Sequence, residues 1–229
     1  MKNIRPVLAC VVCAALIPSA ALAAKPPKPP KPPAGSGALS LAVSRSAIAV
    51  PEAVTISGVL SGASAVGGVS VTLEQDDTRP YGDTYKAVAG AKAVTNAAGA
   101  YGFTQRPQKN TQYRVVAKAS PTVTSAGRLV GVRPFVGLKA STRTPVARRT
   151  VRFSGLVQPA RTGATVLLQR RTATGGFATV RSGVLRASTT GSVFTIAARV
   201  TRSGAYRVKL PGTLELLNGF SRTLKITTR

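Results

Sequence analysis

Carboxylates are the side chains of this sequence that could do chemistry at short range, and three of its six acids lie close together. Asp76 and Asp77 are adjacent and Asp83 follows six residues later. Carboxylates at this spacing in a loop could ligate a hard cation such as calcium. The segment lacks the alternating ligands and the glycine placement of an EF-hand loop, and Arg79 and Lys86 are near enough in sequence to pair with the acids. We interpret it as a solvated loop, with a calcium site as the alternative.

This chain lacks the residues on which most catalytic and transition-metal chemistry depends. There is no His and no Trp, and the two Cys are Cys10 and Cys13. Histidine is the usual proton-transfer residue near neutral pH, and zinc and copper sites depend on His and Cys. The serines and threonines have no His to activate them, and no glycine-rich phosphate loop opens a helix. We therefore expect neither an enzyme nor a cofactor.

Positive charge dominates the chain and is unevenly divided. There are 32 Lys and Arg against 6 Asp and Glu, a formal net charge of +26. Residues 38–133 contain 10 basic and 5 acidic side chains, whereas residues 134–229 contain 17 basic side chains, 14 of them Arg, and one acid, Glu215. Arg presents a planar fork that suits phosphate and carboxylate. Like charges at this density oppose compaction unless counter-ions or a polyanion are present, so we expect an anionic partner.

The N-terminus has the features of a secretory signal peptide. Lys2 and Arg5 precede an apolar run over residues 7–17, and Ala21–Ala23 forms a small-residue cleavage site. The run is shorter than the roughly 20 residues of a membrane span. We assign residues 1–23 to the signal peptide and expect export to the cell envelope or the medium.

Both cysteines lie inside this signal, so the mature chain is predicted to have no disulfide. The segment Val7–Cys10 faintly resembles a lipobox, and lipidation at Cys10 is the alternative, but too few residues precede it for an apolar region. No second apolar segment of similar length follows. We expect no transmembrane segment in the mature chain.

Residues 24–37 are predicted to be a linker rich in Pro and Lys. Three identical Lys-Pro-Pro triplets fill residues 25–33. Such a run favours polyproline II, which has three residues per turn and would place Lys25, Lys28 and Lys31 along one edge. The main interpretation is a stiff spacer. The alternative is that these lysines contact anionic wall polymer or lipid headgroups.

The remainder is an internal duplication. Three segments of the first copy recur in the second: Val54–Gly58 as Val151–Gly155, Val69–Gln75 as Ala164–Gln169, and Gln112–Val115 as Ala205–Val208. The glycines of the first pair are 97 residues apart and the tyrosines of the third are 93 apart. Each copy is long enough for its own core. We therefore predict two domains, residues 38–133 and 134–229.

Apolar side chains in both copies recur at every second residue, the period of a strand with one buried face. Turn clusters interrupt at short intervals, and no window after the signal peptide has helical apolar spacing. Short strands rich in Val and Thr, separated by such turns, predict an all-β fold of two tandem antiparallel β-sandwiches.

These segments resemble the tandem bacterial immunoglobulin-like domains of secreted and surface proteins. The shared features are a strand ending in Ser-Gly, a strand ending in Gln, the Asn96–Gly99 turn, and Tyr-Arg-Val. The resemblance implies that the hydroxyls of Tyr113 and Tyr206, at the start of a late strand, hold a neighbouring loop. Neither copy has the buried Trp or the disulfide of antibody domains, and transthyretin-like sandwiches share the same signals, so both topologies stay open.

The alternation also predicts where the cations of the second copy point. With Tyr206, Val208, Leu224 and Ile226 inward, three cations should share the outer face of one sheet, while another projects from the other sheet and two pairs lie at strand ends or loops. The candidate anion-binding residues are Arg207, Lys209 and Lys225 on the shared face, Arg152 on the other sheet, and the pairs Arg148–Arg149 and Arg170–Arg171.

We interpret the protein as a secreted, non-enzymatic binding or adhesion module of the cell envelope whose basic second domain engages an anionic polymer or lipid headgroups. The alternative is a structural spacer or protein-interaction pair, with contacts through a sheet edge and incidental charge. Nucleic acid is a rival because the isoelectric point is about 11.7. We do not expect it as the physiological partner, because the protein is exported and its placeable aromatic side chains are mostly inward.

Overall fold

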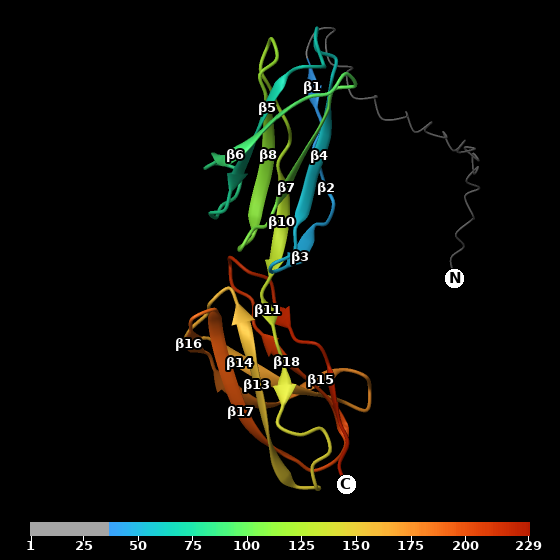
Figure 1. Cartoon of the computed structure of the whole chain (residues 1–229), viewed down its shortest axis with the longest axis vertical. Coiled ribbons are helices and arrows are strands. Elements are labelled where there is room, and N and C mark those ends of the chain that lie inside the picture. Colours follow the sequence, from blue (N-terminus) through green and yellow to red (C-terminus); the bar gives the residue numbers. More distant parts are fainter. Residues whose placement is uncertain (1–36) are drawn as a thin grey trace, which may run out of the picture. The chain divides into compact units, whose positions relative to one another are not determined.

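The computed structural model describes residues 37–229, which form strands and loops (Figure 1). Within these residues there is no helix, and hence none that could cross a membrane. The all-β prediction is confirmed. The predicted signal peptide 1–23 and residues 24–36 of the predicted linker, including Lys25, Lys28 and Lys31, lie outside the described residues.

Two sheets build the first half. One has the order β1-β4-β2, with β7 also paired to β4, and the other has the order β3-β10-β8-β5-β6, with β9 paired to β8. All pairs are antiparallel except β3 with β10. The strands are β1 (Ala38–Leu39), β2 (Ala42–Val43), β3 (Ala47–Ala49), β4 (Val54–Ser61), β5 (Ser70–Asp76), β6 (Lys86–Val94), β7 (Ala100–Gln105), β8 (Thr111–Ala117), β9 (Val123–Thr124) and β10 (Arg128–Arg133).

Two further sheets build the second half, and every pair in them is antiparallel. One has the order β11-β13-β17-β16 with β12 also on β13, and the other has the order β15-β14-β18-β19 with β20 also on β18. The strands are β11 (Phe135–Val136), β12 (Lys139–Ala140), β13 (Arg149–Gln158), β14 (Thr165–Arg171), β15 (Phe177–Val184), β16 (Arg186–Ser188), β17 (Gly191–Val200), β18 (Gly204–Leu210), β19 (Gly219–Phe220) and β20 (Leu224–Ile226).

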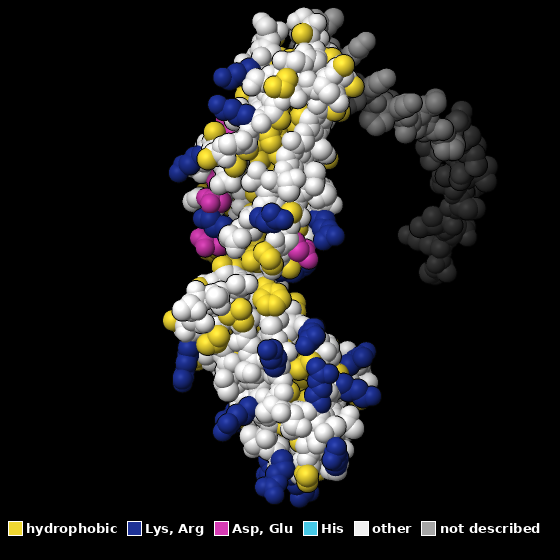
Figure 2. All heavy atoms as spheres, in the orientation of Figure 1, with side chains coloured by type: hydrophobic (Ala, Val, Ile, Leu, Met, Phe, Trp, Pro, Cys, Tyr) yellow, Lys and Arg dark blue, Asp and Glu magenta, His cyan; other side chains and the backbone are white. Residues whose placement is uncertain are grey.

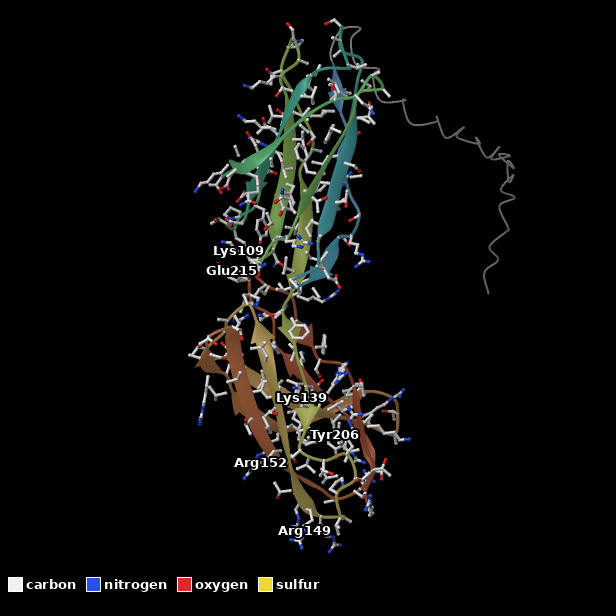
Figure 3. The ribbon with its side chains drawn as sticks, in the orientation of Figure 1. Lys109, Lys139, Arg149, Arg152, Tyr206 and Glu215 are labelled. Atoms are coloured by element: carbon white, nitrogen blue, oxygen red, sulfur yellow. The ribbon has the colours of Figure 1, made fainter. Side chains whose placement is uncertain are left out.

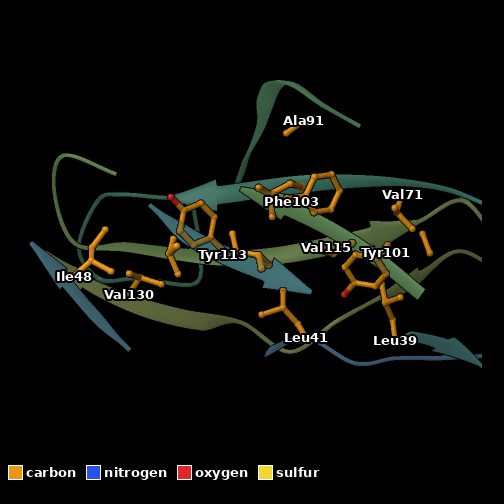
Figure 4. Packing of buried hydrophobic residues seen from close by; sticks show 14 of the residues in the cluster. Leu39, Leu41, Ile48, Val71, Ala91, Tyr101, Phe103, Tyr113, Val115 and Val130 are labelled. Atoms are coloured by element: carbon orange, nitrogen blue, oxygen red, sulfur yellow. The ribbon is translucent and has the colours of Figure 1, made fainter. Parts of the chain in front are cut away.

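Alternate apolar side chains of paired sheets enclose two hydrophobic cores. In β4 the buried residues Val54 and Ile56 alternate with exposed threonine and serine, and in β17 buried and exposed residues alternate over the nine residues from 192 to 200. Figure 4 shows how side chains from both sheets of the first half meet in its core. The second core is formed by residues of β11 to β20. Burial of these alternating faces is the main stabilising contribution of the fold.

The repeated Ser-Gly motif marks a close approach of two backbones in each half. Gly58 is the register partner of Tyr101, and a Cβ atom there would collide with the carbonyl oxygen of Ser40. Gly155 is the register partner of Phe194, and a Cβ atom there would collide with the carbonyl oxygen of Gly137. Only glycine permits the segment of β1 and β2 to lie this close to β4, and the segment of β11 and β12 to lie this close to β13. This requirement explains why both copies have the motif.

The tyrosine that holds a loop is Tyr101, and the expectation for Tyr113 and Tyr206 was wrong. The Tyr101 hydroxyl donates a hydrogen bond to the Ser40 carbonyl across the gap left by Gly58. Tyr113 and Tyr206 are buried, but neither hydroxyl donates to a backbone carbonyl within residues 37–229. Tyr206 instead packs its ring against Phe153, with ring centroids 5.3 Å apart. Burial raises the pKa of Tyr101 to about 12.

A loop of the second half completes the first core. Leu216, between β18 and β19, is 5% exposed and belongs to the core formed by β1 to β10. The Asn110 amide donates to the Glu215 carbonyl at 2.8 Å, and the Leu217 amide donates to the Val132 carbonyl at 2.8 Å. The described residues 37–229 belong to one compact unit. The predicted boundary at 133/134 lies between β10 and β11, but two independent domains stay a prediction.

Leu216→Ala should lower the free energy of unfolding by about 2–4 kcal/mol, because it opens a cavity in the first core. Leu214→Ala in the same loop is the matched control, since Leu214 is 70% exposed, and it should change stability by less than about 0.5 kcal/mol. Urea unfolding of both variants measures the difference. Equal effects would show that the loop does not contribute to the core.

Tyr101→Phe should cost about 1–2 kcal/mol, because it removes a hydrogen bond and leaves the Ser40 carbonyl without its donor. Tyr206→Phe should cost less than about 0.5 kcal/mol, because its hydroxyl makes no comparable bond. Thermal or urea unfolding checks both. A larger loss for Tyr206→Phe would restore the tyrosine assignment made from the sequence.

Candidate anion-binding surface

The ion pairs of residues 37–229 all lie in the first half. Arg45 pairs with Glu52 at 3.2 Å, Lys109 with Asp77 at 3.2 Å, and Arg114 with Glu74 at 2.6 Å. None of the 17 basic side chains of residues 134–229 has a carboxylate within 4.0 Å in the described part of the chain. Figure 2 shows Lys and Arg side chains spread over the visible face of the second half.

Three predicted cations lie on the outer face of the sheet that contains β14, β18 and β20. Arg207 and Lys209 alternate along β18 with the buried residues Tyr206 and Val208. Lys225 lies opposite Ala205 in the register between β18 and β20, so it shares the face of Ala205, Arg207 and Lys209. The structure therefore brings Arg207, Lys209 and Lys225 together on one surface, which we call the Arg207 face.

Neighbouring side chains hold the Arg207 guanidinium in place. Its carbon Cζ lies 3.7 Å from the ring centroid of Phe177 and 4.5 Å from that of Phe220. Its Nε donates to Oε1 of Gln169 at 3.0 Å, and Gln169 is its register partner on β14. Stacking on aromatic rings and one charge-assisted hydrogen bond fix the orientation of a guanidinium. No described residue accepts a hydrogen bond from its two terminal nitrogens. The group is thus oriented with donors to spare for an anion.

Sequence reasoning missed the two phenylalanines of this site. The expectation of inward aromatic side chains covered only those that alternation could place, and it did not include Phe220, which is 43% exposed, or Phe135, which is 42% exposed. Phe177 is half-buried at the first position of β15. Alternation could not place Phe220, because β19 is only two residues long. Phe220 lies opposite Lys209 because β19 pairs with β18, and this pairing is known only from the tertiary structure.

The other predicted cations of the second half lie apart from the Arg207 face. Arg152 is exposed on β13, in the opposite sheet, as predicted. Arg149 is the first residue of β13, and Arg148 precedes it in the left-handed region with φ of 64°. The Arg148 carbonyl accepts a hydrogen bond from Nε of Arg199 at 2.9 Å. Figure 3 shows Arg149 and Arg152 at separate places along this strand.

The pair Arg170–Arg171 ends β14, and its members differ. Arg171 is exposed. Arg170 is half-buried, and its Nη2 donates to the Ser203 carbonyl at 2.8 Å, while its Nε is buried without a partner among the described residues. Arg170 is therefore committed to the loop before β18, and Arg171 is the member of the pair that solvent reaches.

The acidic segment of the first half is a structural loop. Asp76 is 1% exposed, and both its oxygens accept hydrogen bonds. The donors to Oδ2 are the amides of Gly82 at 2.6 Å and Thr84 at 3.3 Å, and those to Oδ1 are the Thr78 amide at 3.0 Å and the Thr84 hydroxyl at 2.9 Å. Burial raises the pKa of Asp76, but these hydrogen bonds outweigh it and lower the pKa to about 2.

The remaining acids do not gather around a cation position. Asp77 pairs with Lys109, and not with Arg79 or Lys86 as the sequence suggested, because the fold brings β8 beside this loop. Within residues 37–229 no group of three or more acidic or cysteine side chains is arranged to hold a metal ion. The calcium alternative therefore has no support in the described part of the chain.

Asp76→Asn should destabilise the protein near neutral pH and remove part of its acid sensitivity. A carboxylate whose pKa is lower in the folded state contributes stability above its unfolded pKa, and this contribution is lost as the pH falls from about 3.8 towards 2. Urea midpoints between pH 6 and pH 2 should converge for the variant and the unchanged protein. Asp83→Asn, at an exposed position, is the control and should leave the profile unchanged. A constant gap at all pH values would show that the ionised carboxylate is not what matters.

The comparisons with known proteins give a weak structural likeness. No protein-family model matches the chain, and no curated protein sequence does. Among solved structures it is similar to one described as "Crystal structure of tetra-tandem repeat in extending region of large adhesion protein", with a TM-score of 0.36 and 13% sequence identity. The alignment covers 85% of this chain and 50% of that one, so the chain spans about half the length of the structure that it matches.

Proposed function

We propose that this protein is a secreted, non-enzymatic binding or adhesion module of the cell envelope, and that its second half binds an anionic polymer through the Arg207 face. The observation that carries the proposal is the set of 17 basic side chains in residues 134–229 with no ion pair among the described residues. Residues of one charge repel one another at this density. A polyanion relieves that repulsion and releases its own counter-ions when it binds.

The geometry of Arg207 supports a specific role for this face. Two phenylalanine rings and Gln169 orient the guanidinium before any ligand arrives, so less conformational entropy is lost on binding. Its terminal nitrogens form the fork that pairs with carboxylate or phosphate. Lys209 and Lys225 add charges on the same face, and neither has an ion-pair partner among residues 37–229. A polymer with repeated carboxylate or phosphate groups matches this row of cations.

The strand order supports an immunoglobulin-like assignment over a transthyretin-like one. The sheet β11-β13-β17-β16 has the A-B-E-D order, and β14-β18-β19 has the C-F-G order, of an immunoglobulin constant-type sandwich. The first half repeats the B-E and C-F-G pairings with β4, β7, β5, β8 and β10. Secretion and envelope localisation rest on the predicted signal peptide and spacer. The rival function, a spacer with protein contacts and incidental charge, is distinguished by the salt dependence of binding.

The test uses the mature chain, because Leu216 belongs to the first core and truncation would expose it. A triple variant, Arg207→Gln with Lys209→Gln and Lys225→Gln, should weaken binding to purified envelope and to polyphosphate. The expected loss is on the order of tenfold to a hundredfold at low salt, since each cation near an anionic surface contributes about 1 kcal/mol. The binding of the unchanged protein should fall steeply as salt rises.

The control triple is Lys86→Gln, Lys92→Gln and Lys118→Gln, three exposed cations of the first half with the same total charge change. It should keep most of the affinity. Equal losses in both triples would make net charge, and not the Arg207 face, the determinant. Binding that is unchanged by salt would overturn the electrostatic proposal and favour the spacer.

A further inference from the structure

An apolar hollow lies on the outer face of the other sheet of the second half. It has a volume of about 510 Å³, and its exposed walls include Phe135 of β11 and Val193 of β17, which are 42% and 37% exposed. Leu156 of β13 lies between them. We call this hollow the Phe135 groove. Figure 2 shows hydrophobic side chains gathered on the visible face of the second half near its start.

The floor of the groove consists of backbone and one buried ring. Gly137 and Gly155 have no side chains, and the carbonyl of Gly137 lies against Gly155. The buried ring of Phe194 lies beneath, so close that a Cβ atom on Gly155 would come within 2.8 Å of its Cζ. Gly137 therefore leaves one outward position without a side chain, and Phe194, which is 2% exposed, lines the hollow from below.

The duplication shows that the groove is a feature of the second half and not of the fold. Identical registers pair the corresponding positions of the two halves. Each wall position has a smaller residue in the first half, and the rim lysine has a neutral one. The correspondences are Ala38 with Phe135, Val59 with Leu156, Ala100 with Val193, and Ala42 with Lys139.

The floor positions differ in the same direction. Ser40 and Tyr101 of the first half correspond to Gly137 and Phe194 of the second. In the first half the Tyr101 hydroxyl donates to the Ser40 carbonyl, so a polar contact closes this place. The second half has neither the hydroxyl nor the serine side chain, because Phe194 and Gly137 occupy these positions. Loss of polar groups at the floor and enlargement of apolar walls together build an apolar site.

The rim of the groove is positively charged. Lys139 lines it directly. An adjoining hollow that shares Val193 and Phe194 with the groove is lined by Arg186, and another that shares Phe135 and Gly137 with it is lined by Arg222. No acidic side chain lines any of these three hollows. The surface thus combines an apolar trough with cations at its edges, which complements an amphiphile that carries negative charge.

A peptide would fit the groove poorly. The backbone of β13 is paired on both sides, with β11 and β12 on one and β17 on the other, and β17 is also paired with β16. A peptide laid across these central strands would find no free backbone partners and would lose the hydration of its own amides. An acyl chain has no such groups to satisfy.

We propose that the Phe135 groove binds a single fatty-acyl chain that ends in an anionic carboxylate, with the chain against Phe135, Leu156 and Val193 and the carboxylate near the Lys139 rim. This site is independent of the Arg207 face, which lies on the other sheet of the second half. Binding here should depend mainly on apolar contact, whereas polymer binding should depend mainly on charge.

The test measures binding of laurate, below its micelle-forming concentration, to the mature chain by titration calorimetry. Affinity should rise about fourfold for each methylene group added to the ligand until the groove is full, so butyrate should bind far more weakly than laurate. Leu156→Thr should weaken laurate binding about tenfold. The matched control is Val59→Thr at the corresponding position of the first half, where Val59 is 41% exposed, and it should have no effect.

Two further variants keep the test decisive. Gly137→Ala should also weaken laurate binding, because the added Cβ atom enters the groove at ordinary contact distances of 3.4 Å or more and leaves the backbone unstrained. Lys139→Gln should weaken laurate more than it weakens dodecanol, which lacks the carboxylate. Both variants, and Leu156→Thr, should retain the thermal stability of the unchanged protein to within a few degrees.

Several outcomes would overturn the proposal. One is equal laurate affinity in the unchanged protein and in stably folded Leu156→Thr and Gly137→Ala. Another is an affinity that does not change with chain length, which would show that the carboxylate alone is bound. Association with anionic vesicles but not with monomeric laurate would indicate a membrane surface instead. Leu156→Thr leaves every charge in place, so loss of laurate binding with unchanged polyphosphate binding separates this site from the Arg207 face.

Discussion

The close approach of two backbones at Gly58 and at Gly155 is the constraint on which both halves depend. The segment of β1 and β2 lies directly against β4, and that of β11 and β12 directly against β13, and a side chain at either glycine would prevent this approach. The space that the glycine leaves is used differently in the two copies. Tyr101 fills it with a hydrogen bond in the first half, and Phe194 forms the floor of the Phe135 groove in the second.

The second half must also fold against its own charge. Its 17 basic side chains have no carboxylate partners among the described residues, so their repulsion opposes compaction and only the buried apolar faces offset it. Strand alternation sends most of these side chains outward, which removes the need to bury them, and Arg170, with its buried Nε, is an exception. The Arg207 site shows how a cation can be held on such a surface, by aromatic rings and one amide oxygen.

The two candidate surfaces differ in chemistry because they lie on different sheets of one sandwich. We propose the Arg207 face as a site for repeated anionic groups and the Phe135 groove as a site for an acyl chain with a charged end. At the position of Arg207 the first half has Arg114, which stacks on Tyr85 but is paired with Glu74. The first half also lacks the large apolar walls of the groove. The loop around Leu216 connects the two halves through the first core.

The sequence by itself determined the all-β class, the duplication, the buried residues and the outward direction of Arg207, Lys209 and Lys225, because strand alternation is a local property with a period of two. Only the tertiary structure decided what lies beside those residues. Phe177 and Phe220 reach Arg207 through strand register, Lys109 reaches Asp77 across strands, and Leu216 enters a core more than 80 residues away in sequence. These contacts depend on which strands pair and in which register, and pairing is set by burial of whole sheets, which no short motif records.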